Sequence, residues 1–134
     1  MTGAKGKLGL ASAAVATVFA FAPVSAQAPD LAMLDTLDRG AWELRLRPEG
    51  TTRRICLRTG RELIQLRHRQ PPCSRFIVQD ESREVTVQYT CRGNGYGRTT
   101  IRRESRDIVQ IRSQGIHSGT PFSMEGEARH LGSC

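Results

Sequence analysis

The chain contains no lysine after Lys7, no Cys-x-x-Cys pair, no His-Glu-x-x-His motif and no Gly-x-Ser-x-Gly motif. Structural zinc sites draw on cysteines or histidines a few residues apart, whereas successive cysteines here are 17, 18 and 43 residues apart. The common zinc and serine hydrolases need the other two motifs. We therefore predict no metal site, no cofactor and no catalytic residues, and expect that the protein is not an enzyme. A hydrolase would need two carboxylates that meet in a cleft.

The sequence also lacks an apolar run of the ~20 residues that a membrane-spanning helix requires. Its most apolar stretch, Leu8 to Ala22, has 15 residues. Lys5 and Lys7 precede this stretch and the small residues Val24-Ser25-Ala26 follow it, which is the pattern of a secretory signal peptide. We predict that residues 1–26 are removed by cleavage after Ala26 and that the protein is periplasmic or secreted.

The remaining 108 residues are enough for one small domain. We divide them into a short N-terminal helix or linker at 27–39 and a disulfide-linked β domain at 40–134. All four cysteines lie in the second part, and an even number of cysteines in an exported chain indicates disulfide bonds.

Arginine is the only strongly basic residue of the exported part. Removal of the two lysines leaves 18 arginines against 13 acidic residues, a net charge of +5. A basic surface suits an anionic glycan, a lipid headgroup or an acidic protein. Nucleic acid is not expected as a partner, because the predicted compartment is outside the cytoplasm and aromatic residues are only 5% of the chain.

The first half of the domain predicts a helix followed by a β-hairpin. Asp30 can cap a short helix that ends at Gly40, with leucines 31, 34 and 37 on one face. Residues 41–47 then alternate between apolar and polar side chains, a turn follows at 48–50, and a second strand covers 51–57. The register of this hairpin stays open: pairing Trp42 with Ile55 or Leu57 leaves Cys56 facing away from them, and pairing Trp42 with Cys56 breaks the apolar match.

A second helix is predicted after this hairpin. Thr59 and Glu62 have the spacing of a capping box, in which each side chain binds the backbone N–H of the other. A helix of about two turns should follow over 61–68, and Pro71-Pro72 should end it.

The strands after residue 72 allow a test of register. A tight turn near 81–83 places Cys73 opposite Cys91 and Ile77 opposite Val87. Residues directly opposite each other are close enough for a disulfide, so we predict the bond Cys73–Cys91, which leaves Cys56 to pair with Cys134.

Further hairpins continue the same sheet. They predict one inward-facing row across five strands, which is apolar throughout: Ile77, Val87, Ile101, Ile111 and Met124. Two apolar residues, Phe76 and Val78, depart from this pattern by facing outward, and we expect the helix near Leu63 to cover them. The predicted fold is mainly β: a single antiparallel meander of about six strands, curved or closed into part of a barrel, with one or two short helices.

The stretch "CRGNGYGRTT" at 91–100 contains three glycines in alternation. A nucleotide-binding loop needs Gly-x-x-x-x-Gly-Lys-Ser/Thr before a helix, whereas here the spacing is one residue short, Arg98 replaces lysine and a strand follows. We therefore predict the turn of a β-hairpin.

Several of these motifs together resemble a family of small exported bacterial proteins, domain of unknown function 3617. They are Gly-x-Trp-Glu in "GAWEL", the four spaced cysteines, "GYGRT", and the closing Arg-x-x-Gly-x-Cys in "ARHLGSC". The resemblance covers Gly40 to Cys134 and implies an exported fold with the four cysteines as disulfide partners. It implies no activity and no ligand residues, because the family has no established function.

We therefore expect a non-catalytic envelope protein that acts as a binding or structural module for an anionic partner. The crowded arginines of the first hairpin are the candidate anion contacts: Arg45, Arg47, Arg53 and Arg54. The alternative is an inhibitor of an exogenous hydrolase such as lysozyme. It would present its contact residues on an exposed loop, either 92–98 or 115–120.

Overall fold

The computed structural model describes residues 1–3, 30–69 and 73–134. The predicted cleavage site, nearly all of the predicted signal peptide and the proline pair at 71–72 lie outside the described residues. The elements are α1 (Ala32–Asp35), β1 (Gly40–Arg47), β2 (Thr51–Leu57), the 3-10 helix η1 (Arg61–Leu63), β3 (Cys73–Asp80), β4 (Glu84–Cys91), β5 (Gly95–Arg103), β6 (Ile108–His117) and β7 (Thr120–Gly132).

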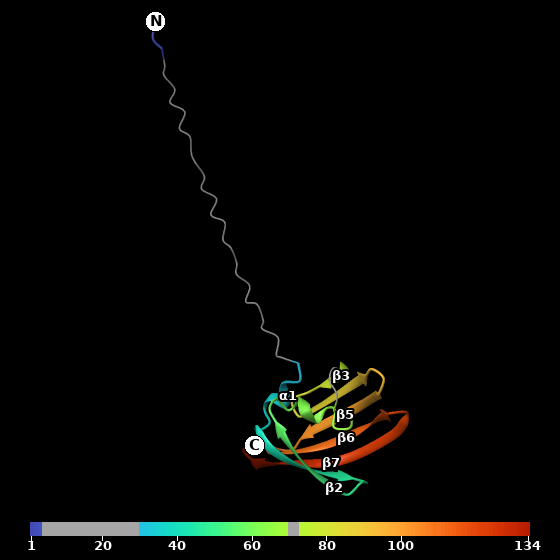
Figure 1. Ribbon diagram of the computed structural model, residues 1–134. Coiled ribbons are helices and arrows are strands. Elements are labelled where there is room, and N and C mark those ends of the chain that lie inside the picture. The colour runs from blue at the N-terminus through green and yellow to red at the C-terminus, as the bar shows by residue number, and fades with distance from the viewer. Residues whose placement is uncertain (4–29, 70–72) are drawn as a thin grey trace.

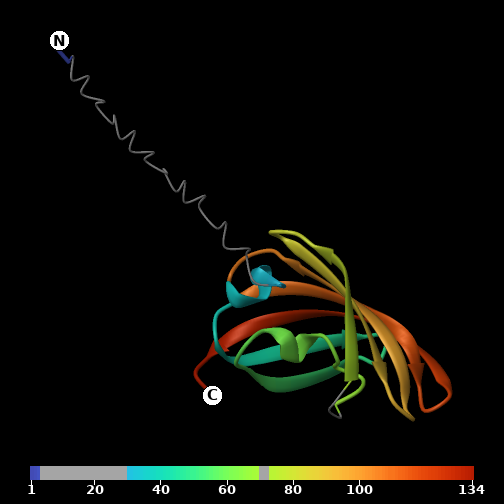
Figure 2. The ribbon, with the colours of Figure 1, turned by 90° about the horizontal axis from the view of Figure 1, so that it is seen from above.

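All seven strands form one antiparallel sheet in the order β2-β1-β7-β6-β5-β4-β3. The last five strands are a meander, and β1 pairs with the free side of β7, so that β2 and β3 become the two edges. Figures 1 and 2 show that the sheet is strongly curved. The prediction of a mainly β, curved antiparallel meander is confirmed, with seven strands and an open sheet in place of a partly closed barrel.

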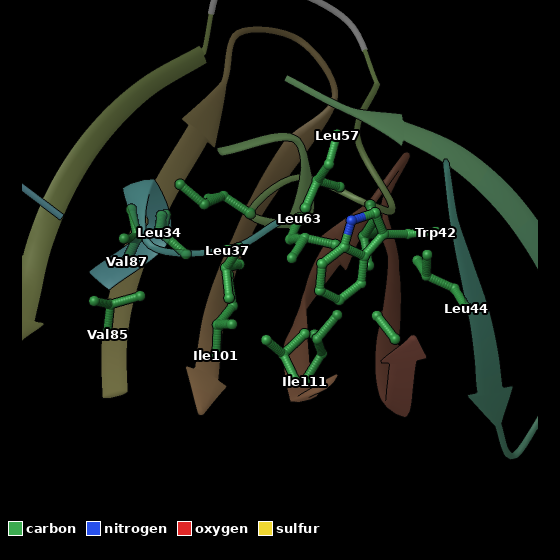
Figure 3. Packing of buried hydrophobic residues seen from close by; sticks show 14 of the residues in the cluster. Leu34, Leu37, Trp42, Leu44, Leu57, Leu63, Val85, Val87, Ile101 and Ile111 are labelled. Carbon is green, nitrogen blue, oxygen red and sulfur yellow. The ribbon is translucent and has the colours of Figure 1, made fainter. Parts of the chain in front are cut away.

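The concave face of the sheet carries the hydrophobic core (Figure 3). Trp42 and Leu44, which alternate with polar residues along β1, are completely buried there. The indole Nε1 of Trp42 donates a hydrogen bond of 2.8 Å to the carbonyl oxygen of Asp38. A buried tryptophan therefore contributes a large apolar area without leaving its N–H unpaired.

Two short segments cover the open side of the curved sheet: α1, and residues 58–69, which we call the inner segment (Figure 2). Leu34 from α1 and Leu63 and Ile64 from the inner segment are almost completely buried. They supply the apolar layer that the concave face needs, since one sheet face cannot bury itself.

Both predicted helices are much shorter than expected. Asp30 does not cap α1; the carboxylate of Asp80 accepts the N–H of Leu31 at 2.8 Å instead. The inner segment forms three residues of 3-10 helix, although Glu62 does accept the backbone N–H of Thr59 as the capping box predicts. An α-helix advances about 100° per residue. Residues 63, 64, 66 and 68 are all buried. On an α-helix these four positions would not share one face.

The register predicted for the third and fourth strands is confirmed: Cys73 lies opposite Cys91 and Ile77 opposite Val87. The pairing of Ile101 with Ile111 is also confirmed. In the first hairpin, whose register was open, Trp42 lies opposite Ile55.

Two other predicted pairings are wrong by two residues. Val87 lies opposite Thr99 and not Ile101, and Met124 lies opposite Ser113 and not Ile111. The predicted pairings required connections at 92–96 and 116–119, but only residues 92–94 and 118–119 lie between the strands. A shift of two residues keeps every side chain on its face, so the polar Thr99 and Ser113 are buried on the concave side.

The expected cover over the outward apolar residues of β3 is also wrong. Phe76 and Val78 remain 70% and 40% exposed. The segment predicted to cover them packs into the concave face, on the other side of the sheet. The β3–β4 ladder has an irregularity between Ile77 and Gln79, and such bulges are a usual feature of edge strands.

Both predicted disulfides are present, and every cysteine is paired. Cys56–Cys134 joins β2 to the end of the chain, with 5.8 Å between its Cα atoms, and Cys73–Cys91 joins β3 to β4. Two disulfides indicate an oxidising, extracytoplasmic location. Among the described residues there is no helix whose length and apolar character would let it cross a membrane.

Candidate functional site: a basic groove between the sheet edges

A groove of about 490 Å³ lies where the sheet remains open. Its walls come from the edge strands β2 and β3, and the inner segment forms the surface between them. We call it the seam groove. Ile55 and Leu66 contribute apolar wall, whereas Arg53, Arg69 and Arg75 contribute positive charge.

Arg53 lies in the groove because of its position in β2. It pairs with Leu44 of β1 and therefore shares the concave face with that buried leucine. Its Nη1 and Nη2 atoms are 3.5 and 3.4 Å from the carbonyl oxygen of Leu66, while its Nε atom is buried without a hydrogen-bond partner among the described residues. Burial lowers the pKa of the Arg53 guanidinium, and the nearby charge of Arg69 lowers this pKa further.

Arg75 reaches the same groove from the opposite edge strand. Its Nε and Nη2 atoms donate hydrogen bonds of 2.9 and 2.7 Å to one atom, the side-chain oxygen of Gln65. Burial also lowers the pKa of Arg75, with a further contribution from Arg61. An amide oxygen thus occupies the edge of the guanidinium that binds carboxylates and phosphates in a bidentate manner.

The acids near the groove are engaged elsewhere. Arg61 donates to Asp35 at 2.7 Å, and this bond lowers the pKa of the Asp35 carboxyl. The carboxylate of Glu62, which lines the groove, accepts backbone N–H groups at 58 and 59. Within the described ranges, Arg53, Arg69 and Arg75 therefore have no ion-pair partner.

The four arginines proposed from the sequence do not form one cluster. Only Arg53 lies in the seam groove. Arg45 and Arg54 are exposed on the convex face, where Arg45 forms an ion pair of 3.0 Å with Glu43. Arg47 lies opposite Glu125 in the β1–β7 ladder. Successive strand residues face opposite sides, and this alternation, already visible in the sequence, separates Arg53 from its neighbours.

The sequence reasoning missed Arg69, Arg75 and Gln65. Arg69 and Gln65 belong to the inner segment, which was expected to form a helix on the other side of the sheet. Arg75 belongs to β3, and nothing in the sequence indicated that β3 and β2 would border the same groove.

A buried histidine fixes the inner segment beneath the groove. The Nδ1 atom of His68 lies 3.0 Å from the hydroxyl of Tyr89, and its Nε2 atom lies 3.1 and 3.0 Å from the carbonyl oxygens of Asn94 and Ile116. Nε2 faces only acceptors and therefore carries a hydrogen; in the neutral ring Nδ1 then accepts from the tyrosine hydroxyl. His68 thus has a structural role that ties the inner segment to two hairpins.

The glycine-rich stretch is the β4–β5 hairpin turn, as predicted, and its glycines allow this packing. A Cβ atom on Gly97 would overlap the Tyr89 hydroxyl that contacts His68. A Cβ atom on Gly95 would overlap the carbonyl oxygen of Ile116. The two glycines therefore leave room for the side chain of Tyr89 and for the backbone of β6.

A second polar anchor lies deeper in the concave face. The hydroxyl of Thr99 donates a hydrogen bond of 2.7 Å to the carbonyl oxygen of Ile64, and it is 2.7 Å from the hydroxyl of Ser113. These bonds satisfy a buried carbonyl just after the short 3-10 helix of the inner segment. Together with His68 they hold the surface between β2 and β3 in place, so the groove is preformed. The chain matches no family model, no curated protein and no solved structure.

Proposed function

We propose that this chain is an exported, non-catalytic protein of the cell envelope that binds an anionic partner through the seam groove. The proposal includes the periplasmic or secreted location, cleavage after Ala26, and membership of the family called domain of unknown function 3617. Two disulfides support the location. One observation supports the binding site above all: the buried Nε atom of Arg53, without a partner among the described residues.

The energetics of Arg53 favour an anion. A guanidinium that is partly removed from water loses hydration, and this loss is offset only when a negative group binds it. Arg69 and Arg67 repel the Arg53 guanidinium, and the attraction of Glu49, which is itself paired with Arg67 at 3.0 Å, offsets part of that repulsion. An anion in the groove would supply the missing acceptor and reduce the repulsion among the arginines. Because the inner segment is fixed from below, little ordering would be needed on binding.

The binding site can be tested with Arg53→Gln. We expect the variant to bind anionic probes about tenfold or more weakly, since a hydrogen bond to a charged group contributes about 1.5–3 kcal/mol and tenfold corresponds to about 1.4 kcal/mol. The probes are a sulfated glycan, poly-glutamate and phosphatidylglycerol vesicles, with affinity measured by titration at several salt concentrations.

Arg45→Gln is the matched control for this experiment. It removes the same charge from the neighbouring strand, but on the convex face, where Arg45 is paired with Glu43. We expect its affinities to equal those of the wild type. Equal weakening by both substitutions would indicate attraction by net charge alone, and binding of no probe would contradict the proposed function.

A second candidate function, inhibition of an exogenous hydrolase, is favoured by the meeting of two turns. The backbone N–H of Ser118 donates to the carbonyl oxygen of Asn94 at 3.0 Å, and their side chains are bonded at 2.7 Å. The turns at 92–94 and 118–119 thus form one surface, beside which Tyr96 is 49% exposed. Exposed tyrosines are frequent anchors of protein interfaces.

This candidate predicts a different mutant profile. If the protein inhibits lysozyme, Tyr96→Ser should lose most of the inhibition in a cell-wall lysis assay, whereas Arg53→Gln should retain it. Full inhibition by Tyr96→Ser would exclude the surface of the two turns as the inhibitory site.

A further inference from the structure

We propose that the seam groove binds a small amphiphilic oxyanion, a carboxylate or phosphate head attached to an apolar chain. This inference rests on the proposed function and names the class of its ligand. The groove combines guanidinium groups with the apolar side chains of Ile55 and Leu66, and its one carboxylate among the described residues, Glu62, accepts backbone N–H groups. Its volume of about 490 Å³ falls within the range of roughly 300–1,000 Å³ that holds small molecules.

The head group would bind at Arg53. The Nη atoms of this residue make only long contacts, of 3.4 and 3.5 Å, with the carbonyl oxygen of Leu66, and Nε makes none among the described residues. An oxyanion can bind along the Nε edge of a guanidinium with two parallel hydrogen bonds. Because Nε is buried, the Arg53 side chain has to rotate to present this edge, whereas the fold is unchanged, since β2 and the inner segment already place the residue in the groove.

Gln65 acts as an internal competitor for the second guanidinium. Its side-chain oxygen accepts both hydrogen bonds of Arg75, at 2.9 and 2.7 Å, while its side-chain nitrogen donates to the carbonyl oxygen of His68 at 3.2 Å. A neutral amide oxygen is a weaker acceptor than a carboxylate or phosphate oxygen. An anion that reaches Arg75 would therefore displace Gln65.

The apolar wall distinguishes this ligand from a free ion. The carbonyl oxygen of Leu66 contacts Arg53, and its neighbour Gln65 contacts Arg75. Ile55 lies two positions from Arg53 on the same face of β2. A bare phosphate would leave this wall in contact with water. Each methylene group of a chain that covers the wall should increase the affinity about fourfold.

The test compares matched probes by isothermal titration calorimetry on the purified, oxidised protein. The amphiphiles are octanoate and octyl phosphate, the corresponding heads alone are acetate and inorganic phosphate, and octyl glucoside is the neutral chain. We expect each octyl anion to bind at least tenfold more tightly than its head alone and than octyl glucoside. The ratio of octanoate to octyl phosphate identifies the preferred head.

Two substitutions test the assigned roles. Arg53→Gln should weaken the binding of the octyl anions about tenfold or more. Gln65→Ala should tighten it severalfold, because it frees the edge of Arg75, an effect that simple loss of structure would not produce. Arg45→Gln should leave both affinities unchanged, and thermal melts should show all three variants folded.

The outcomes separate this inference from the proposed function. If acetate and phosphate bind as tightly as the octyl anions, or if octyl glucoside binds equally well, the inference that the ligand is an amphiphilic anion is wrong. An anion site at Arg53 then stands only if Arg53→Gln weakens the binding of anions. Weaker binding to Gln65→Ala would contradict the competitor role. Binding of polyanions without any binding of octyl anions refutes the inference alone, whereas the failure of every anionic probe refutes both.

Discussion

Removal of the bond between Cys56 and Cys134 should lower the free energy of unfolding by about 4 kcal/mol. We expect this for the double variant Cys56→Ser/Cys134→Ser, which leaves no free thiol. The bond closes a loop with a sequence separation of 78, and the chain-entropy estimate for such a loop is about 4.5 kcal/mol. In addition, β2 pairs with β1 alone among the described strands, so the bond is a second attachment of an edge strand.

Urea denaturation of the oxidised proteins would measure this effect. The matched control is Cys73→Ser/Cys91→Ser, which removes a bond of sequence separation 18, for which the same estimate gives about 3 kcal/mol. That bond joins two strands that are already paired directly. An unchanged midpoint in the first variant, or a much larger loss in the control, would contradict the view that the long-range bond contributes most.

The same variant should also affect the seam groove. Arg53 and Ile55 reach the groove from β2, in which Cys56 directly follows Ile55. A β2 strand that is held on only one side will separate from the sheet more often. Loss of anion binding at urea concentrations where Trp42 fluorescence is still native would show that local opening precedes global unfolding.

The sequence predicted most of the sheet because alternation and turns are local signals. Trp42, Leu44 and Leu46 mark a strand with one buried face, and the structure has that strand. The pairing of Cys73 with Cys91 followed from a short turn, for which few registers were available. Both disulfide assignments were obtained from this one register and the count of four cysteines.

The two errors of register have a common physical cause. A period of two residues fixes the face of each side chain but does not distinguish registers that differ by two. Val87 faces the core whether it lies opposite Ile101 or Thr99. The length of the connecting turn decides between the two registers. These turns are tighter than expected because glycines permit close approach of neighbouring strands.

The candidate site was only partly predictable. Arginine content indicated an anionic partner, and alternation would have separated Arg53 from Arg54. The position of the inner segment is a tertiary effect: the open concave face has to be covered, and this overrides the local helix signal of Thr59 and Glu62. No local pattern indicated that Gln65 and Arg75 would meet Arg53 in one groove.

Replacement of His68 by leucine should destabilise the protein by about 3–5 kcal/mol. His68 is only 1% exposed, and its ring contacts a hydroxyl and two carbonyl oxygens in the interior. Leucine is of similar bulk but cannot donate or accept a hydrogen bond. A lost hydrogen bond costs about 0.5–1.5 kcal/mol and a buried polar group left with no partner about 1–3 kcal/mol. The Asn94 carbonyl oxygen keeps the Ser118 N–H as a donor and the Tyr89 hydroxyl keeps Ser113, so two lost bonds and one deprived carbonyl, that of Ile116, account for the expected loss.

Tyr89→Phe is the control that separates these contributions. It removes the hydroxyl that binds Nδ1 but keeps both carbonyl contacts of Nε2, so we expect a loss of about 1 kcal/mol in the same urea experiment. If His68→Leu costs no more than Tyr89→Phe, the carbonyl oxygen of Ile116 must find another donor, and the Ser118 N–H must suffice for that of Asn94. The inner segment would then be held by Thr99 and apolar packing. If the larger loss is observed, the histidine maintains the surface on which Arg53 meets the groove.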